Sequence, residues 1–108
     1  MYKDDLVKIK HIKDAVSEIE IFTLNKTRKT LDEDKVLTYA LVKLIEVIGE
    51  AASKISPEFR IKHNKIPWNK IIGMRNHLVH VYFDIDLDIL WDTISIDIVE
   101  LKACLNEI

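Results

Sequence analysis

The amino-acid sequence predicts an all-α fold, an antiparallel four-helix bundle with one short additional helix. Apolar residues recur at spacings of three and four along most of the chain, which is typical of helices that bury one face. The chain contains only two glycines and two prolines, so few positions interrupt a helix. No strand or repeat is predicted, and 108 residues suffice for a single domain over residues 1–108 with one modest core.

The first helix is predicted over residues 4–24, with lysines and acids opposite its apolar face. Residues 25–30 form a polar connection. Thr30, followed three residues later by Glu33, predicts a capping box at the start of the second helix. The apolar face of the first helix consists of Ile9, Ile12, Val16, Ile19 and Phe22.

The second helix, around residues 36–48, is more apolar than one buried face requires. Its polar residues fall within an arc of about 140° on a regular helix. The surplus predicts either a subunit contact or a small bundle that covers this helix on both sides. Gly49 then allows another helix to cross closely. The inner line is Leu37, Leu41, Leu44 and Ile48, and the surplus apolar residues are Val36, Ala40 and Val47.

Three further elements are predicted in the second half of the chain. Ser56 before Pro57 predicts the N-cap of a short helix, and Pro67 presets the first turn of a longer helix that carries a polar cluster. Asp84 or Asp86 is expected to cap the final helix. The apolar stripe of this final helix comprises Leu87, Leu90, Trp91, Ile94, Ile98, Leu101, Leu105 and Ile108.

The polar cluster gathers Arg75, Asn76, His77, His80 and Tyr82 within eight residues. An arginine fork can bind a phosphate, and a histidine can exchange a proton near neutral pH. On one regular helix Arg75 and Tyr82 would share a side, whereas His80 would lie about 140° from Arg75 and near Asn76. The alternative interpretation is structural, because an arginine and a histidine near a helix end often cap or form ion pairs.

The spacing of Arg75, His80 and Tyr82 resembles the R-x4-H-x-Y signature of the HepT-like toxins, a branch of the HEPN superfamily of helical ribonucleases. Three segments resemble that family in the same order: IGEAASKI at 48–55, PWNKIIGMRN at 67–76 and DIDLDILW at 84–91. The resemblance implies a HEPN-like fold and a metal-independent endoribonuclease toxin. It also implies that two motifs face each other at a homodimer interface and form a composite site.

The resemblance further assigns roles and partners. It makes Arg75 and His80 catalytic, with Tyr82 in support, and it makes RNA the substrate. Asn76 lies four residues before His80, so on one helix it could support the site by orienting His80 or a phosphate oxygen. Tyr82 would accept AMP from a partner antitoxin, a minimal nucleotidyltransferase of the MntA type, and this modification would silence the toxin. The competing hypothesis is a non-catalytic helical subunit that helps a nucleotidyltransferase to bind a nucleotide or substrate.

Metal-free RNA cleavage needs a base, a cation and an acid. One chain offers Arg75 as the cation and His80 as one titrating group. The missing proton donor must come from His77, Tyr82, water or a second copy of His80. His77, His80 and Asp84 are alternative candidates for metal ligands, but only two histidines lie on adjacent helical positions. We therefore expect no metal and no cofactor.

Charge and cysteine content narrow the function classes. The net charge is only −2, which argues against a protein that coats nucleic acid by bulk charge. Residues 54–75 nevertheless hold six basic residues and one acid, whereas residues 84–108 hold seven acids and one lysine. The basic stretch predicts either local attraction of a polyanion or a solvated loop. Cys104 is the only cysteine, which excludes an internal disulfide and a thiolate zinc cage.

Nothing in the sequence suggests a membrane protein. The longest apolar run is too short to span a bilayer, and residues 1–5 do not resemble a signal peptide. We therefore expect a cytoplasmic protein without membrane contact.

Overall fold

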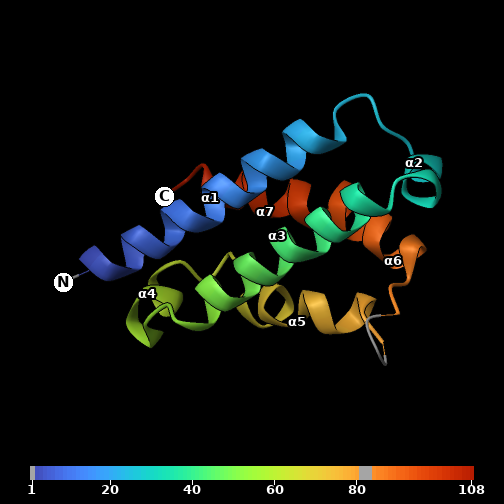
Figure 1. Ribbon diagram of the computed structural model, residues 1–108. Helices are drawn as coiled ribbons and strands as arrows, with labels where there is room; N and C mark the ends of the chain where they lie inside the picture. Colours follow the sequence, from blue (N-terminus) through green and yellow to red (C-terminus); the bar gives the residue numbers. More distant parts are fainter. Residues whose placement is uncertain (1, 81–83) are drawn as a thin grey trace.

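The computed structural model describes residues 2–80 and 84–108 and is all-α, as predicted (Figure 1). Three long helices and a composite final helix form the bundle, and two short helices join them. The short helix α2 was not predicted. The elements are α1 (Lys3–Thr23), α2 (Arg28–Glu33), α3 (Lys35–Ser53), α4 (Pro57–Lys62), α5 (Trp68–Leu78), α6 (Leu87–Asp92), the π-helical turn η2 (Thr93–Asp97) and α7 (Ile98–Leu105).

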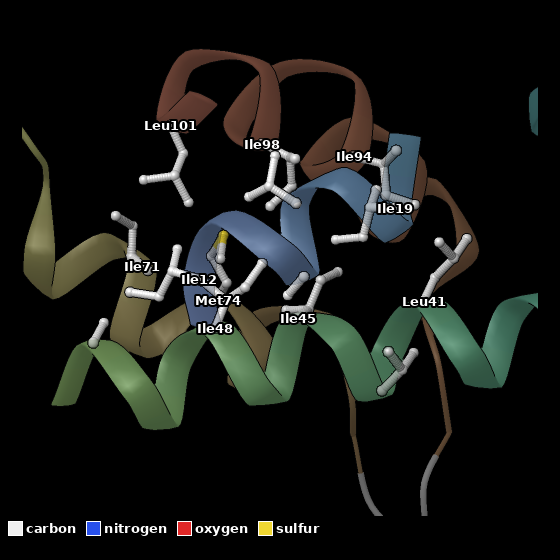
Figure 2. Packing of buried hydrophobic residues seen from close by; sticks show 14 of the residues in the cluster. Ile12, Ile19, Leu41, Ile45, Ile48, Ile71, Met74, Ile94, Ile98 and Leu101 are labelled. Atoms are coloured by element: carbon white, nitrogen blue, oxygen red, sulfur yellow. The ribbon is translucent and has the colours of Figure 1, made fainter. Parts of the chain in front are cut away.

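The hydrophobic core lies between α1, α3, α5 and the final helix, and each of these contributes buried apolar side chains. Figure 2 shows Ile12 of α1, Ile45 and Ile48 of α3, Met74 of α5 and Ile98 of α7 meeting in one cluster. Each of these five side chains is at most 3% exposed. Because α3 packs against both α1 and α5, it forms the central support of the fold.

The predicted close helix crossing at Gly49 is confirmed. A Cβ atom at Gly49 would lie 3.2 Å from the backbone oxygen of Ile72, so the backbones of α3 and α5 nearly touch here. Figure 1 shows the two helices running side by side in opposite directions. The crossing therefore fixes how the helix that carries the polar cluster sits against α3.

Side-chain caps define the starts of three helices. The predicted cap at Ser56 is confirmed, since its Oγ accepts a hydrogen bond from the N–H of Phe59 at 3.3 Å. Of the two candidates for the final helix, Asp86 is the cap, with 3.1 Å from its Oδ1 to the N of Ile89. The predicted Thr30–Glu33 capping box is wrong: Asp34 caps α3, because its carboxylate accepts from the N–H of Leu37.

The connection at residues 25–30 also differs from the prediction, because the chain already turns into α2 at Arg28. Thr30 lies inside this short helix, and its Oγ1 accepts a hydrogen bond from the N–H of Thr27 at 3.1 Å. Thr30 thus stabilises the start of α2 and not the start of the longer helix α3. The capped residue is Thr27, one turn before Thr30.

A buried carboxylate ties α1 to the start of α4. Asp5 is only 5% exposed. It accepts hydrogen bonds from the backbone N–H of Ser56 at 2.8 Å and from the hydroxyl of Ser56 at 2.6 Å. These hydrogen bonds hold the pKa of Asp5 below its ordinary value although burial opposes them. The carboxylate is thus both buried and satisfied.

The surplus apolar surface of α3 is smaller than the sequence indicates. Val36 is 80% exposed, but Ala40 and Val47 are half-buried. Tyr39, on the same part of α3, is 51% exposed. Within the described parts of the chain, no helix is both long and apolar enough to cross a membrane.

Candidate active site

The helix that carries the polar cluster is shorter than predicted. It ends at Leu78, and Val79 is already extended with φ −112° and ψ 123°. His80 therefore lies beyond the helix, and the predicted angle of about 140° between Arg75 and His80 on one regular helix does not apply. Arg75 remains in the last turn, where its backbone oxygen accepts from the N–H of Val79 at 3.1 Å.

Two short extended segments follow the helix and pair in antiparallel fashion. The N–H of His80 donates to the oxygen of Asp84 at 2.8 Å, and the N–H of Asp86 donates to the oxygen of Leu78 at the same distance. Val79 and Ile85 form the bridge between them. This pairing joins the end of α5 to the residues just before α6, and the fully buried Leu78 anchors it to the core.

A sequence signal for this extended segment exists. From Val79 to Leu87, apolar residues occupy every second position, VHVYFDIDL, which is the period of a strand rather than a helix. Two β-branched valines at its start favour the extended backbone. This alternation is not expected of a helix that continues beyond Leu78.

Arg75 is held from a neighbouring helix. Its guanidinium Nε lies 3.6 Å from Oε2 of Glu46 on α3, and the two side chains are 40% and 32% exposed. Lys43 lies 3.5 Å from the other oxygen of Glu46. In the sequence, Glu46 stands out only as one of the polar residues of the second helix. The available signal was its position, three residues before the crossing glycine, Gly49.

The other predicted site residues are placed as follows. Asn76 and His77 on α5 and His80 beyond it are all exposed. The structure gives no hydrogen bond between Asn76 and His80, because the helix that would have aligned them ends between them. Tyr82 lies outside the described residues.

Two of the six basic residues in the stretch at 54–75 form ion pairs with the acidic end of the chain. Lys70 on α5 pairs with Asp97 of the π-helical turn at 2.9 Å, and this contact raises the pKa of Lys70. Lys65 lies 3.8 Å from Glu107. The basic and acidic segments of the sequence therefore contact each other in the fold. Arg75 differs, because its acidic partner, Glu46, lies on α3.

A metal-binding cluster is not evident at the site. Within residues 2–80 and 84–108, no three His, Cys, Asp or Glu side chains gather as a metal-binding group. What the arrangement offers is a half-exposed guanidinium at the end of α5 and an exposed imidazole on the paired segment that follows. The first can bind a phosphate and the second can take up or release a proton near neutral pH.

Comparison with known proteins agrees with this chemistry. Residues 12–108 match a family model described as "Ribonuclease HepT-like". A "putative RNase" of Caldanaerobacter subterraneus subsp. tengcongensis is 47% identical over 76 residues, which cover 70% of this chain and 68% of that protein. A "probable ribonuclease HepT" of Thermococcus cleftensis is 36% identical over 95 residues, 88% of this chain and 86% of that protein.

A longer relative also matches. The "gamma-glutamylcyclotransferase and putative RNase" of Methanocaldococcus jannaschii is 38% identical over 102 residues. The match covers 94% of this chain and 46% of that protein, so this chain corresponds to less than half of it. No solved structure gives a significant match.

Proposed function

Because the chain belongs to the HepT-like ribonuclease family, we propose that it is a metal-independent endoribonuclease in which Arg75 and His80 are catalytic. The observation that carries the proposal is that Arg75 and His80 both reach solvent at the end of α5. Arg75 is also held by a carboxylate from the neighbouring helix.

The proposed reaction follows from the chemistry of these groups. An imidazole of His80 removes the proton from the 2′-hydroxyl, and the 2′-oxygen attacks the phosphorus. Arg75 stabilises the charge that develops on the phosphorane oxygens. The bond from phosphorus to the 5′-oxygen breaks as a protonated imidazole donates its proton to that oxygen. The products are a 2′,3′-cyclic phosphate and a 5′-hydroxyl.

We propose that the site is composite and forms in a homodimer. The reaction needs a proton acceptor and a proton donor at once, and each motif offers one His80. An apolar contact surface lies nearby on α3, where Val36 is 80% and Tyr39 is 51% exposed. Tyr39 and Asp84 line the same surface hollow, so this part of α3 adjoins the segment that carries His80.

We also propose that the chain is the toxin of a toxin–antitoxin pair and that a partner nucleotidyltransferase transfers AMP to Tyr82. An AMP group there would add bulk and a negative phosphate to the motif that contains Arg75, and would compete with RNA for the guanidinium. Tyr82→Phe removes the acceptor oxygen while keeping the ring. Intact mass after incubation with the partner enzyme and ATP should show adenylate on wild type alone. Equal adenylate on both proteins would place the acceptor elsewhere.

RNA cleavage by purified protein with chelator present tests the catalytic proposal. Wild type should cleave, and His80→Ala should cleave about 10²-fold more slowly or worse, because it loses its general acid–base group. His77→Ala is the matched control, since it removes an exposed histidine of the same motif. If His80→Ala cleaves as well as wild type, the binding role beside a nucleotidyltransferase becomes the better proposal.

A further inference from the structure

Glu46 on α3 forms an ion pair with the proposed catalytic arginine. Its Oε2 lies 3.6 Å from Nε of Arg75, and its Oε1 lies 3.5 Å from Nζ of Lys43. One carboxylate is thus shared by two cations, one from its own helix and one from the helix of the motif.

The fold places this contact where the two helices are closest. Gly49 lets α3 approach the backbone oxygen of Ile72 on α5. Glu46 lies three residues before Gly49 and Arg75 lies three residues after Ile72, which is about one turn from the crossing on each antiparallel helix. The tight backbone contact therefore sets the distance between the carboxylate and the guanidinium.

The ion pair is poorly suited to a purely structural role. Both partners are about one-third exposed or more, and half-exposed ion pairs add little to stability. The core between α3 and α5 already joins the helices through Ile45, Ile48 and Met74. What the contact does restrict is the side chain of Arg75, which otherwise has several rotatable bonds and many accessible rotamers.

The side on which Glu46 touches Arg75 leaves the phosphate-binding groups available. The closest approach is through Nε, and the Arg75 side chain donates no hydrogen bond to another described residue. Among the described residues none occupies the N–H groups of its fork, and these groups can bind the two oxygens of a phosphate. Lys43 offsets the negative charge of Glu46, so the trio keeps a net positive charge toward RNA.

We infer that Glu46 is a positioning residue that aims Arg75 at the phosphorane during RNA cleavage. This inference rests on the proposed function. Glu46 does not touch the substrate and acts through Arg75. Because orientation matters most where charge develops, the loss of Glu46 should lower kcat and leave KM for RNA nearly unchanged.

The test compares Glu46→Ala and Glu46→Gln with Glu20→Ala as a matched control. Glu20 on α1 makes a similarly exposed ion pair between helices, 2.8 Å from Lys102 on α7, and neither helix carries Glu46 or Arg75. Glu46→Ala should lower kcat about 10-fold, as losses of supporting groups at active sites do, with KM within about twofold. Glu46→Gln should recover part of the rate because it keeps an acceptor oxygen of the same reach. Glu20→Ala should match wild type.

Two further readouts separate positioning from other roles. The ¹⁵N relaxation of the Arg75 Nε–H group should show greater mobility in Glu46→Ala than in wild type or Glu20→Ala. The cleavage rate of Glu46→Gln should be lower than that of wild type at every pH, and it should still fall on the acidic side of the pH–rate profile as the wild-type rate does. Loss of that fall would make Glu46 the base itself and overturn the positioning role.

Other outcomes are equally decisive. Wild-type kcat in Glu46→Ala, while Arg75→Ala is inactive, would refute the role of Glu46 and leave the proposed function standing. A faster Glu46→Ala would show that Glu46 restrains Arg75 and would also overturn the inference. A wild-type protein that does not cleave RNA would refute the proposed function, and the role of Glu46 with it.

Discussion

Replacement of Asp5 by alanine should destabilise the protein strongly although the residue is far along the chain from the proposed site. Asp5→Ala removes the acceptor of two hydrogen bonds from Ser56, one from its N–H and one from its hydroxyl. Hydrogen bonds to charged groups contribute about 1.5–3 kcal/mol each, and some of this is recovered if water enters the site. We therefore expect the free energy of unfolding to fall by about 3 kcal/mol.

Urea denaturation followed by circular dichroism measures this change. For a domain of this size, a loss of 3 kcal/mol corresponds to a fall in Tm of roughly 10–20 °C. Ser56→Ala removes the hydroxyl, which both donates to Asp5 and caps α4, and it retains the backbone N–H that donates to Asp5. It should cost about 2–3 kcal/mol, of which about 1 kcal/mol comes from the lost cap.

The pH dependence supplies a second check. Because the folded pKa of Asp5 lies below its unfolded value, the stabilisation is fully present above the unfolded pKa and is lost as the pH falls through the folded pKa. The difference in unfolding free energy between wild type and Asp5→Ala should thus be constant above about pH 5 and shrink below about pH 4. A difference under about 0.5 kcal/mol at pH 7, or one that does not shrink in acid, would refute the reasoning.

Three other changes have defined outcomes. Gly49→Val should lower the free energy of unfolding by about 1–3 kcal/mol in urea titrations, because a Cβ there would lie 3.2 Å from the oxygen of Ile72; stability equal to wild type would show that the helices can separate freely. Trp68→Phe should cost about 1 kcal/mol, because the indole N–H donates to backbone oxygens at 3.2 and 3.3 Å; no loss would mean that water replaces these bonds. Arg75→Lys should recover only part of the rate that Arg75→Ala loses in a gel-based RNA cleavage assay, because a point charge lacks the fork; full recovery would mean that charge alone suffices.

Helical periodicity predicted the fold class and most of the helices correctly. The caps at Ser56 and Asp86 and the close approach at Gly49 also followed from local chemistry, since each depends on residues within a few positions or on the absence of a side chain. The helix α2 was missed because a helix of six residues has too few apolar positions to show a period. The π-helical turn at Thr93–Asp97 was missed because the apolar stripe through it fits a regular helix.

The sequence identified the residues of the candidate site, but it predicted their arrangement in space less well. The residues of the motif were identified from their spacing, but the end of α5 at Leu78 depends on pairing with Ile85 and Asp86, which the helical interpretation did not anticipate. Glu46 could not be joined to Arg75 from one sequence, because the two are 29 positions apart and meet only where α3 and α5 cross. Contacts between distant elements are the part of the site that local patterns do not encode.

Mixing wild-type and His80→Ala chains tests most directly whether two copies of the chain build one ribonuclease site. In an equilibrated equal mixture, about a quarter of the dimers hold two wild-type chains. A composite site that needs both imidazoles predicts about a quarter of the wild-type cleavage rate at the same total protein concentration. A rate of about half would mean that each chain cleaves RNA independently, and would contradict the composite site.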